Sequence, residues 1–212
     1  MKTPAPLPTF HSRVVPVVVV TDPAQAVPMA EALLAGGVDV IEITLRSSAA
    51  LAAIEAVARA VPAMQVGAGT VTRASEVAQV IAAGARFALS PGATPALLDA
   101  VTAAGLPFIP GVATPGEAMS ARDAGFTLMK CFPAAQLGGV EVLKAWGGPL
   151  PDLRFCPTGG VSLANMGQFL ALPNVAMVGG SWLTPAAAVQ AGDWAQITRL
   201  AREATLAAQA IA

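Results

Sequence analysis

Histidine and cysteine are almost absent from this chain of 212 residues, which contains one histidine, His11, and two cysteines, Cys131 and Cys156. With no close pair of cysteines and a single imidazole, a zinc site is not expected. Two thiols in separate apolar runs do not form the dense framework of a disulfide-stabilised secreted domain. The composition therefore favours buried, reduced thiols in a cytoplasmic protein that needs no metal or other cofactor.

Charge is also scarce, because charged residues make up 12% of the chain and the formal net charge is -1. No cluster of lysine or arginine indicates a nucleic-acid partner or a membrane surface. Apolar runs such as Val14 to Val20 are too short to span a bilayer. Residues 1–11 contain several prolines and no apolar segment of the kind found in signal peptides. A small-molecule partner is the remaining expectation, and the first dozen residues with His11 carry no readable role.

Short β-branched runs alternate with alanine-rich segments along the whole chain. The expected strands are Val14–Val20, Val38–Thr44, Gln65–Thr70, Arg86–Ser90, Pro107–Gly111, Thr127–Phe132, Arg154–Thr158 and Val175–Gly179. The expected helices are Pro23–Ala35, Ala49–Val61, Ala74–Ala83, Pro95–Ala104, Pro115–Ala124, Val140–Ala145, Leu163–Ala171 and a broken region from Pro185 to Ala210. Pairs such as Thr94-Pro95 and Thr114-Pro115 are typical helix starts, with a capping hydroxyl before proline.

Eight alternations of strand and helix predict a parallel sheet, and a closed (β/α)8 TIM barrel is the favoured architecture. The length is near the lower end for that fold, so the loops must be short. An open doubly wound sheet is the weaker alternative, because the turn Val20-Thr21-Asp22-Pro23 lacks the expected glycines. No internal linker is visible, so residues 1–212 are expected to form one domain, with a short N-terminal helix closing the bottom of the barrel.

Lys130 is the polar exception in the apolar run Thr127–Phe132. The chain has only two other lysines, Lys2 and Lys144. Burial disfavours the charged ammonium, and a neutral amine is a nucleophile that forms a Schiff base with a carbonyl. The structural alternative is a lysine whose long side chain carries its amine out to water. The other strand ends decide between the two interpretations.

Barrel enzymes place their chemistry at the carboxyl ends of the strands. The second strand places Glu42, Thr44 and Arg46 on one face by its period of two. Glu42 can shuttle protons beside the amine of Lys130, and Arg46 can bind a substrate carboxylate and disfavour a second positive charge on Lys130. An ordinary ion pair would explain Glu42 and Arg46 alone, but three buried charged groups at one end are costly without a function.

Glycine pairs end the seventh and eighth strands, where barrels commonly bind phosphate. Glycine permits close approach of an anion, and the N–H groups of Gly160 to Ser162 are expected to open a helix whose dipole favours negative charge. The glycines of this expected phosphate site are Gly159, Gly160, Gly179 and Gly180.

Several motifs together resemble the 2-keto-3-deoxy-6-phosphogluconate (KDPG) aldolase family, whose members include enzymes that also cleave 4-hydroxy-2-oxoglutarate. The resemblance extends over nearly the whole chain, with the motifs in the family's order. They are Val15-Pro16-Val17-Val18, Glu42-Ile43-Thr44-Leu45-Arg46, Val66-Gly67-Ala68-Gly69-Thr70-Val71, Ser90-Pro91-Gly92, Ile109-Pro110-Gly111-Val112, Lys130-Cys131-Phe132-Pro133-Ala134, Phe155-Cys156-Pro157-Thr158-Gly159-Gly160-Val161 and Gly179-Gly180-Ser181-Trp182-Leu183.

The resemblance implies a cytosolic homotrimer of class I aldolase barrels in the Entner–Doudoroff pathway, acting on a phosphorylated keto acid and releasing pyruvate. It implies that Lys130 forms the Schiff base and that Glu42 is the general acid and base. The remaining implied contacts are Arg46, Thr70, Pro91 and Phe132 around the pyruvyl part, Thr158 beside the aldehyde part, and Gly159, Gly160, Gly179, Gly180 and Ser181 around the phosphate.

Three alternatives stay open from the sequence. The first is an aldolase for the galactonate epimer of the same substrate. The second is a phosphosugar isomerase or epimerase barrel that needs no imine. The third is a non-catalytic barrel that binds phosphorylated ligands, with Lys130 as a simple cation.

Overall fold

Parallel strands alternate with helices throughout the computed structural model, which describes residues 3–211; Lys2 and both ends of the expected 1–212 domain lie outside the described residues. The elements are β1 (Val14–Val18), η1 (Pro23–Gln25), α1 (Ala26–Ala35), β2 (Val40–Thr44), α2 (Ala50–Ala60), β3 (Gln65–Gly69), α3 (Ala74–Ala82), β4 (Phe87–Leu89), α4 (Pro95–Ala104), β5 (Phe108–Ile109), β6 (Gly111–Val112), α5 (Pro115–Asp123), β7 (Leu128–Cys131), α6 (Gly139–Gly147), β8 (Arg154–Pro157), α7 (Met166–Leu170), β9 (Val178–Gly180), α8 (Ala186–Ala191) and α9 (Trp194–Gln209). The eight expected strands and the helices expected between and after them are therefore present, with bounds that differ by a few residues.

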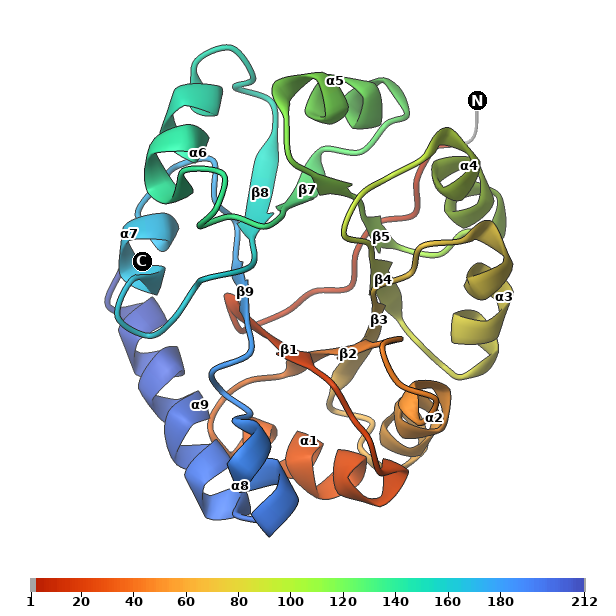
Figure 1. The fold of residues 1–212 in the computed structure, drawn as a ribbon, viewed down its shortest axis with the longest axis vertical. Helices are drawn as coiled ribbons and strands as arrows, with labels where there is room; N and C mark the ends of the chain where they lie inside the picture. Colours follow the sequence, from red (N-terminus) through yellow and green to blue (C-terminus); the bar gives the residue numbers. More distant parts are fainter. Residues whose placement is uncertain (1–2, 212) are drawn as a thin grey trace.

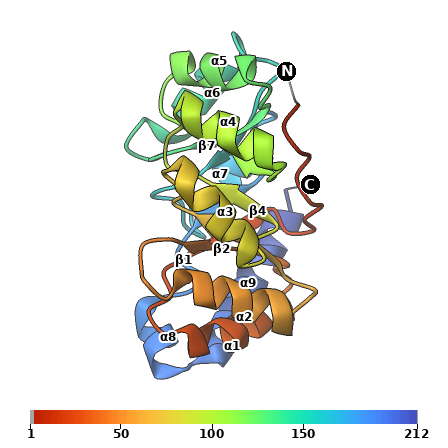
Figure 2. The same cartoon turned by 90° about the vertical axis from the view of Figure 1, so that its right-hand side faces the viewer.

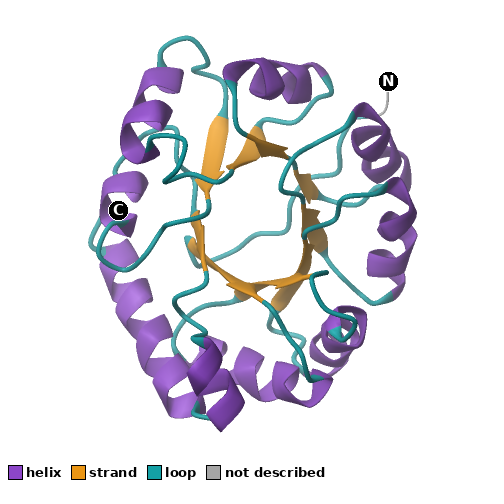
Figure 3. Cartoon of the chain, in the orientation of Figure 1, coloured by secondary structure: helices purple, strands orange, loops and turns teal. Residues whose placement is uncertain are grey.

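The strands form two parallel sheets that curl toward each other, with the helices on the outside (Figure 1, Figure 3). One sheet has the order β5-β4-β3-β2-β1-β9, and the other has the order β6-β7-β8. The expected strand Pro107–Gly111 is divided at Pro110, which has no N–H to donate to a neighbouring strand. Isolated parallel bridges, Phe155 with Val175 and Thr158 with Gly179, connect β8 to the chain at β9.

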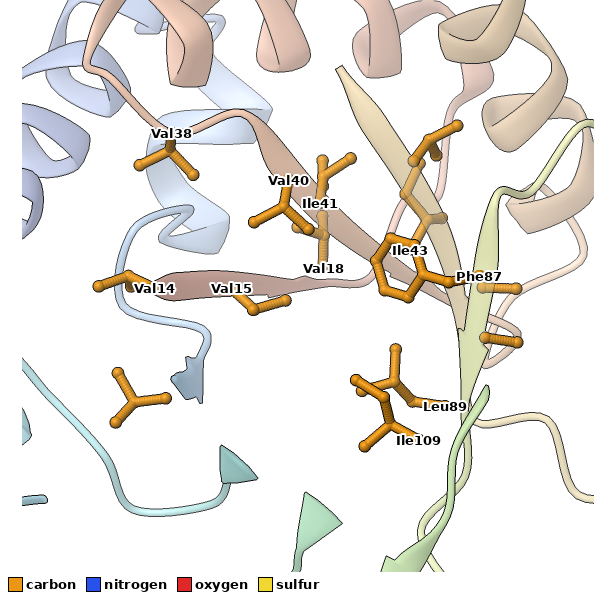
Figure 4. Close-up of a cluster of buried hydrophobic side chains, with 14 of the residues drawn as sticks. Val14, Val15, Val18, Val38, Val40, Ile41, Ile43, Phe87, Leu89 and Ile109 are labelled. Atoms are coloured by element: carbon orange, nitrogen blue, oxygen red, sulfur yellow. The ribbon is translucent and has the colours of Figure 1, made fainter. Parts of the chain in front are cut away.

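The strands are buried on both faces, as expected for a parallel sheet covered by helices. Every residue of β1 and of β2 is buried. Figure 4 shows apolar side chains of β1, β2, β4 and β5 gathered into one cluster. Gly67 leaves room for the ring of Phe87, because a Cβ at position 67 would lie well under 3.0 Å from that ring. The interior below the candidate site is thus filled by packed side chains.

Helices α4 and α5 begin a few residues after the preceding strands, at caps that are encoded locally. Thr94 Oγ1 accepts a hydrogen bond from the Leu97 N–H at 3.3 Å. Thr114 Oγ1 accepts from the Glu117 N–H at 3.2 Å, and a Glu117 carboxylate oxygen accepts from the Thr114 N–H at 3.1 Å, which completes a capping box. These caps keep the loops short at the carboxyl ends of the strands, where the expected site lies.

The expectation of an N-terminal helix is wrong, because none of the residues 3–13 is helical. Pro4, Pro6 and Pro8 follow one another at every second position, and proline cannot donate the backbone hydrogen bonds of a helix. The segment instead runs extended along the end of the molecule where β1 begins (Figure 2). Phe10 reaches the interior there, with its ring centroid 5.0 Å from that of Phe87.

Asp39 anchors this segment to the start of β2. Its carboxylate accepts hydrogen bonds from the backbone N–H groups of His11 and Ser12, both at 2.9 Å, and lies 2.8 Å from His11 Nδ1. Partial burial opposes ionisation of Asp39, but the bonds from His11 and Ser12 outweigh it and hold the pKa of this carboxyl below its ordinary value. His11 thus has a structural contact that the sequence did not reveal.

Candidate active site

Lys130 and Glu42 form a buried ion pair between β7 and β2. Lys130 Nζ lies 2.8 Å from Glu42 Oε1 and 3.2 Å from Oε2, although the residues are 88 positions apart in the chain. The two residues are only 4% and 1% exposed, respectively. Removing two charges from water is costly even when they pair, so a buried pair of this kind is weak evidence for stability and suggests a chemical role.

The neighbouring strands fix this geometry. The backbone N–H of Lys130 donates to the carbonyl of Pro110 at 2.8 Å, which holds β7 against the chain between β5 and β6. Glu42 extends over Gly69 of β3, where a Cβ would lie well under 3.0 Å from the Glu42 carboxylate and its Cγ. Glycine at position 69 is therefore required by the space that Glu42 occupies, a requirement not visible in the sequence.

Phe132 and the two thiols complete the surroundings of Lys130. The Phe132 ring centroid lies 5.7 Å from Lys130 Nζ, within the range of a cation–π contact. Cys156 is the register partner of Lys130 on β8, and Cys131 follows Lys130 directly. Burial raises the pKa of each thiol to about 12. Both cysteines therefore remain neutral near physiological pH and do not compete with the lysine as nucleophiles.

Arg46 and Ser181 line one cavity of about 470 Å³ at the carboxyl ends of β1, β2 and β9, together with Val17, Val19 and residues of the η1 and α8 regions. Arg46 is exposed, and its Nε donates to Thr44 Oγ1 at 3.2 Å. Its expected effect on the charge of Lys130 gains no support, because the charged side chain in contact with Lys130 is Glu42. Val17 is the register partner of Glu42 on the neighbouring strand, although neither Glu42 nor Lys130 lines this cavity.

Thr70 directly follows β3 and Pro91 lies two residues beyond the neighbouring strand β4; both are half-buried. Thr70 has a φ of 59°, an unusual conformation for a β-branched residue and one often associated with functional sites. Pro91 packs directly on Gly111 of β6, where a Cβ would overlap the Pro91 backbone.

The loop after β8 differs from the expectation in one respect. Gly159 and Gly160 have φ values of 94° and 76°, which favour glycine. The N–H groups from Gly160 to Ser162 do not open a helix, because α7 begins only at Met166. Asn165, which the sequence analysis missed, shapes this loop instead: its Oδ1 accepts from the Ser162 N–H at 2.8 Å, and its Nδ2 donates to the Gly160 carbonyl at 2.9 Å.

The last strand brings Gly179 and Gly180 to the same end of the molecule. Gly179 lies against the buried side chain of Thr158, and Gly180 lies against the ring of Trp182. Ser181 follows them and is exposed. The fold thus gathers strand ends from β2, β3, β4, β7, β8 and β9 around the Lys130–Glu42 pair.

A model of the family "KDPG and KHG aldolase" matches residues 9–200. The chain belongs to this aldolase family. A 2-dehydro-3-deoxy-phosphogluconate aldolase of Pseudoalteromonas atlantica is 54% identical over 198 residues, which cover 93% of this chain and 92% of that protein. A KHG/KDPG aldolase of Escherichia coli K12 is 53% identical over 191 residues, which cover 90% of each chain.

A solved structure of the family has the same fold. It is a KDPG aldolase from Legionella pneumophila, with pyruvate captured at low pH as a covalent carbinolamine intermediate. It is 45% identical to this chain, covers 92% of this chain and 94% of its own length, and superposes with a TM-score of 0.90.

Within residues 3–211 no group of three or more histidine, cysteine, aspartate or glutamate side chains is placed to hold a metal ion. No helix among the described residues is long and apolar enough to cross a membrane. His11, the single imidazole of the chain, is engaged with Asp39 at the N-terminal end of β2.

Proposed function

We propose that this family member is a class I aldolase that reversibly cleaves 2-dehydro-3-deoxy-6-phosphogluconate to pyruvate and D-glyceraldehyde 3-phosphate, the reaction of the Entner–Doudoroff pathway. The observation that carries the proposal is the buried contact between Lys130 Nζ and the Glu42 carboxylate at 2.8 Å. The covalent carbinolamine of pyruvate in the Legionella pneumophila relative supports the same chemistry. We also propose cleavage of 4-hydroxy-2-oxoglutarate to pyruvate and glyoxylate, as the name of the Escherichia coli relative suggests.

The reaction begins when Glu42 accepts a proton from Lys130 and frees the amine. The amine adds to the C2 carbonyl of the substrate, and Glu42 returns a proton to the carbinolamine oxygen as water leaves. The protonated imine withdraws electrons while Glu42, directly or through water, takes the proton of the C4 hydroxyl. The C3–C4 bond then breaks and releases the aldehyde. The enamine is protonated at C3, and water hydrolyses the resulting imine to pyruvate and free Lys130.

The remaining residues bind the two ends of the substrate. A guanidinium is suited to a carboxylate, and Arg46 is assigned to this end with Thr70 and Pro91. Phe132 packs on the pyruvyl methyl group, consistent with its distance from Lys130 Nζ. The aldehyde and phosphate part is assigned to Thr158, Gly159, Gly160, Gly179, Gly180 and Ser181.

We propose that the two sheets close into one (β/α)8 barrel and that residues 1–212 form a single aldolase domain. The bridge between Thr158 and Gly179 supports the closure on one side. On the other side, Pro110 alone separates β5 of one sheet from β6 of the other, and this supports the closure there. We also propose a cytoplasmic homotrimer, on the resemblance to the family. Light scattering coupled to size-exclusion chromatography measures the molar mass of the assembly in solution and so tests the trimer.

The proposal is tested by coupling pyruvate release to lactate dehydrogenase, with the gluconate and galactonate epimers assayed side by side. Release from the gluconate epimer at the higher kcat/KM is the expected result. The Lys130→Ala variant should release no pyruvate, and Glu42→Gln should be slowed by about a hundredfold or more. Normal turnover by a folded Lys130→Ala protein would exclude the imine mechanism.

A further inference from the structure

Gly179 has no room for a side chain. A Cβ at this position would lie well under 3.0 Å from Thr158 Oγ1 and 3.2 Å from both Cβ and Cγ2 of Thr158. Gly179 is not among the glycines with positive φ, so its backbone conformation is open to other residues. The space taken by Thr158, and not the backbone, is therefore what requires glycine at position 179.

The backbone of Thr158 is held in place on both sides. Its N–H donates to the carbonyl of Cys131 at 2.9 Å, and its carbonyl accepts from the N–H of Ala134 at 2.8 Å. Its side chain is buried, since the residue is 5% exposed. With the backbone fixed in this way, the direction of the hydroxyl depends on rotation about the Cα–Cβ bond.

Two neighbours restrict that rotation. Thr158 Oγ1 lies 3.4 Å from the carbonyl oxygen of Cys156, to which it donates, and 3.8 Å from the Cys156 sulfur. On the opposite side, the hydroxyl occupies the space above Gly179. The side-chain face of Gly179 is filled by Thr158, so Gly179 can contact a phosphate group only through its backbone. The glycine at position 179 is therefore explained by the Thr158 side chain and not by a bound phosphate.

We propose that Gly179 is a positioning residue for stereoselectivity: by lacking a side chain, it lets the Thr158 hydroxyl point to where it distinguishes the two epimers at C4. This inference rests on the proposed function. The epimers differ in which face of the aldehyde carbonyl joins the enamine. A hydroxyl oxygen held at one fixed place can turn its proton from the Cys156 carbonyl to the developing oxygen at C4, and it stabilises that oxygen in one epimer and not in the other.

The experiment compares kcat/KM for the gluconate and galactonate epimers in wild type and in Gly179→Ala. The ratio of the two values should fall by about tenfold, the change expected when one hydrogen bond no longer separates two transition states. Gly148→Ala is the matched control, because Gly148 has no neighbour within 4 Å of its missing Cβ and should leave the ratio unchanged. An equal fall of both values in Gly179→Ala would overturn the proposal.

A double variant separates positioning from general damage. Thr158→Val lacks the hydroxyl, so adding Gly179→Ala to it should not lower the ratio further; a further fall of similar size would overturn the proposal. If Gly179→Ala alone does not fold, Gly179→Ala combined with Thr158→Ala should fold, because the overlap with Oγ1 and Cγ2 is gone. An insoluble double variant would exclude Thr158 as the reason for the glycine.

The wild-type assay distinguishes this inference from the proposed function. Absence of pyruvate release from both epimers would remove the aldolase proposal itself. Release from both epimers at equal kcat/KM would leave the aldolase proposal intact and overturn the role of Gly179.

Discussion

Replacing the Lys130–Glu42 pair by apolar side chains tests whether its charges are kept for chemistry. Glu42→Leu leaves the Lys130 ammonium, 4% exposed, without its partner. Breaking a buried pair from one side costs about 3–5 kcal/mol, and the same holds for Lys130→Met, which leaves the Glu42 carboxylate alone. For a chain of this length, that loss lowers the unfolding midpoint by about 6–20 °C.

The double variant, with both replacements, should recover most of this loss. It buries no charge, and apolar replacement of a buried ion pair is commonly neutral or stabilising by about 1–4 kcal/mol. Thermal unfolding followed by circular dichroism, at one pH and one protein concentration, measures all four proteins. All three variants should lack aldolase activity. If the double variant is destabilised by the sum of the two single losses, the pair is a stabilising element and the reasoning is refuted.

Three further predictions concern other parts of the molecule. Gly69→Ala displaces the neighbouring carboxylate and should lower kcat by about a hundredfold, whereas Gly148→Ala should not; equal kcat values would contradict the crowding at Gly69. Asp39→Asn should destabilise the protein at neutral pH. Because the folded pKa of Asp39 lies below its ordinary value of 3.8, this difference in unfolding midpoint should shrink as the pH falls through and below 3.8. A constant difference across that range would show that the carboxylate charge is irrelevant. Cys131 and Cys156 should not react with a thiol reagent at neutral pH until the protein is unfolded, since burial raises the pKa of each thiol to about 12; rapid labelling of native protein would contradict their burial.

Local signals in the sequence account for most of the fold. The β-branched runs and the capping pairs, such as Thr94-Pro95, are set by neighbouring residues, so the strands and most helix starts could be predicted. Two expectations of helical structure failed. The N-terminal helix is prevented by prolines at every second position, and the turn held by Asn165 delays α7 until Met166.

The candidate site could be predicted only in part. Strand period placed Glu42 and Lys130 at one end of the molecule, because the carboxyl ends of parallel strands converge there. Their direct contact depends on β2 and β7, which are brought together only by the folded chain. The requirements for glycine at positions 69 and 179 also come from other strands, since they depend on the side chains of Glu42 and Thr158.

The most direct test of the imine mechanism is trapping by borohydride. The protein is incubated with pyruvate and sodium borohydride and digested, and the modified peptide is identified by mass spectrometry. Reduction of the imine should place one stable adduct on the peptide that contains Lys130, with loss of activity in proportion to labelling. Lys144, on the outer helix α6, should remain unmodified and serves as the internal control. A folded protein that retains full activity and carries no adduct on Lys130 would contradict the central claim.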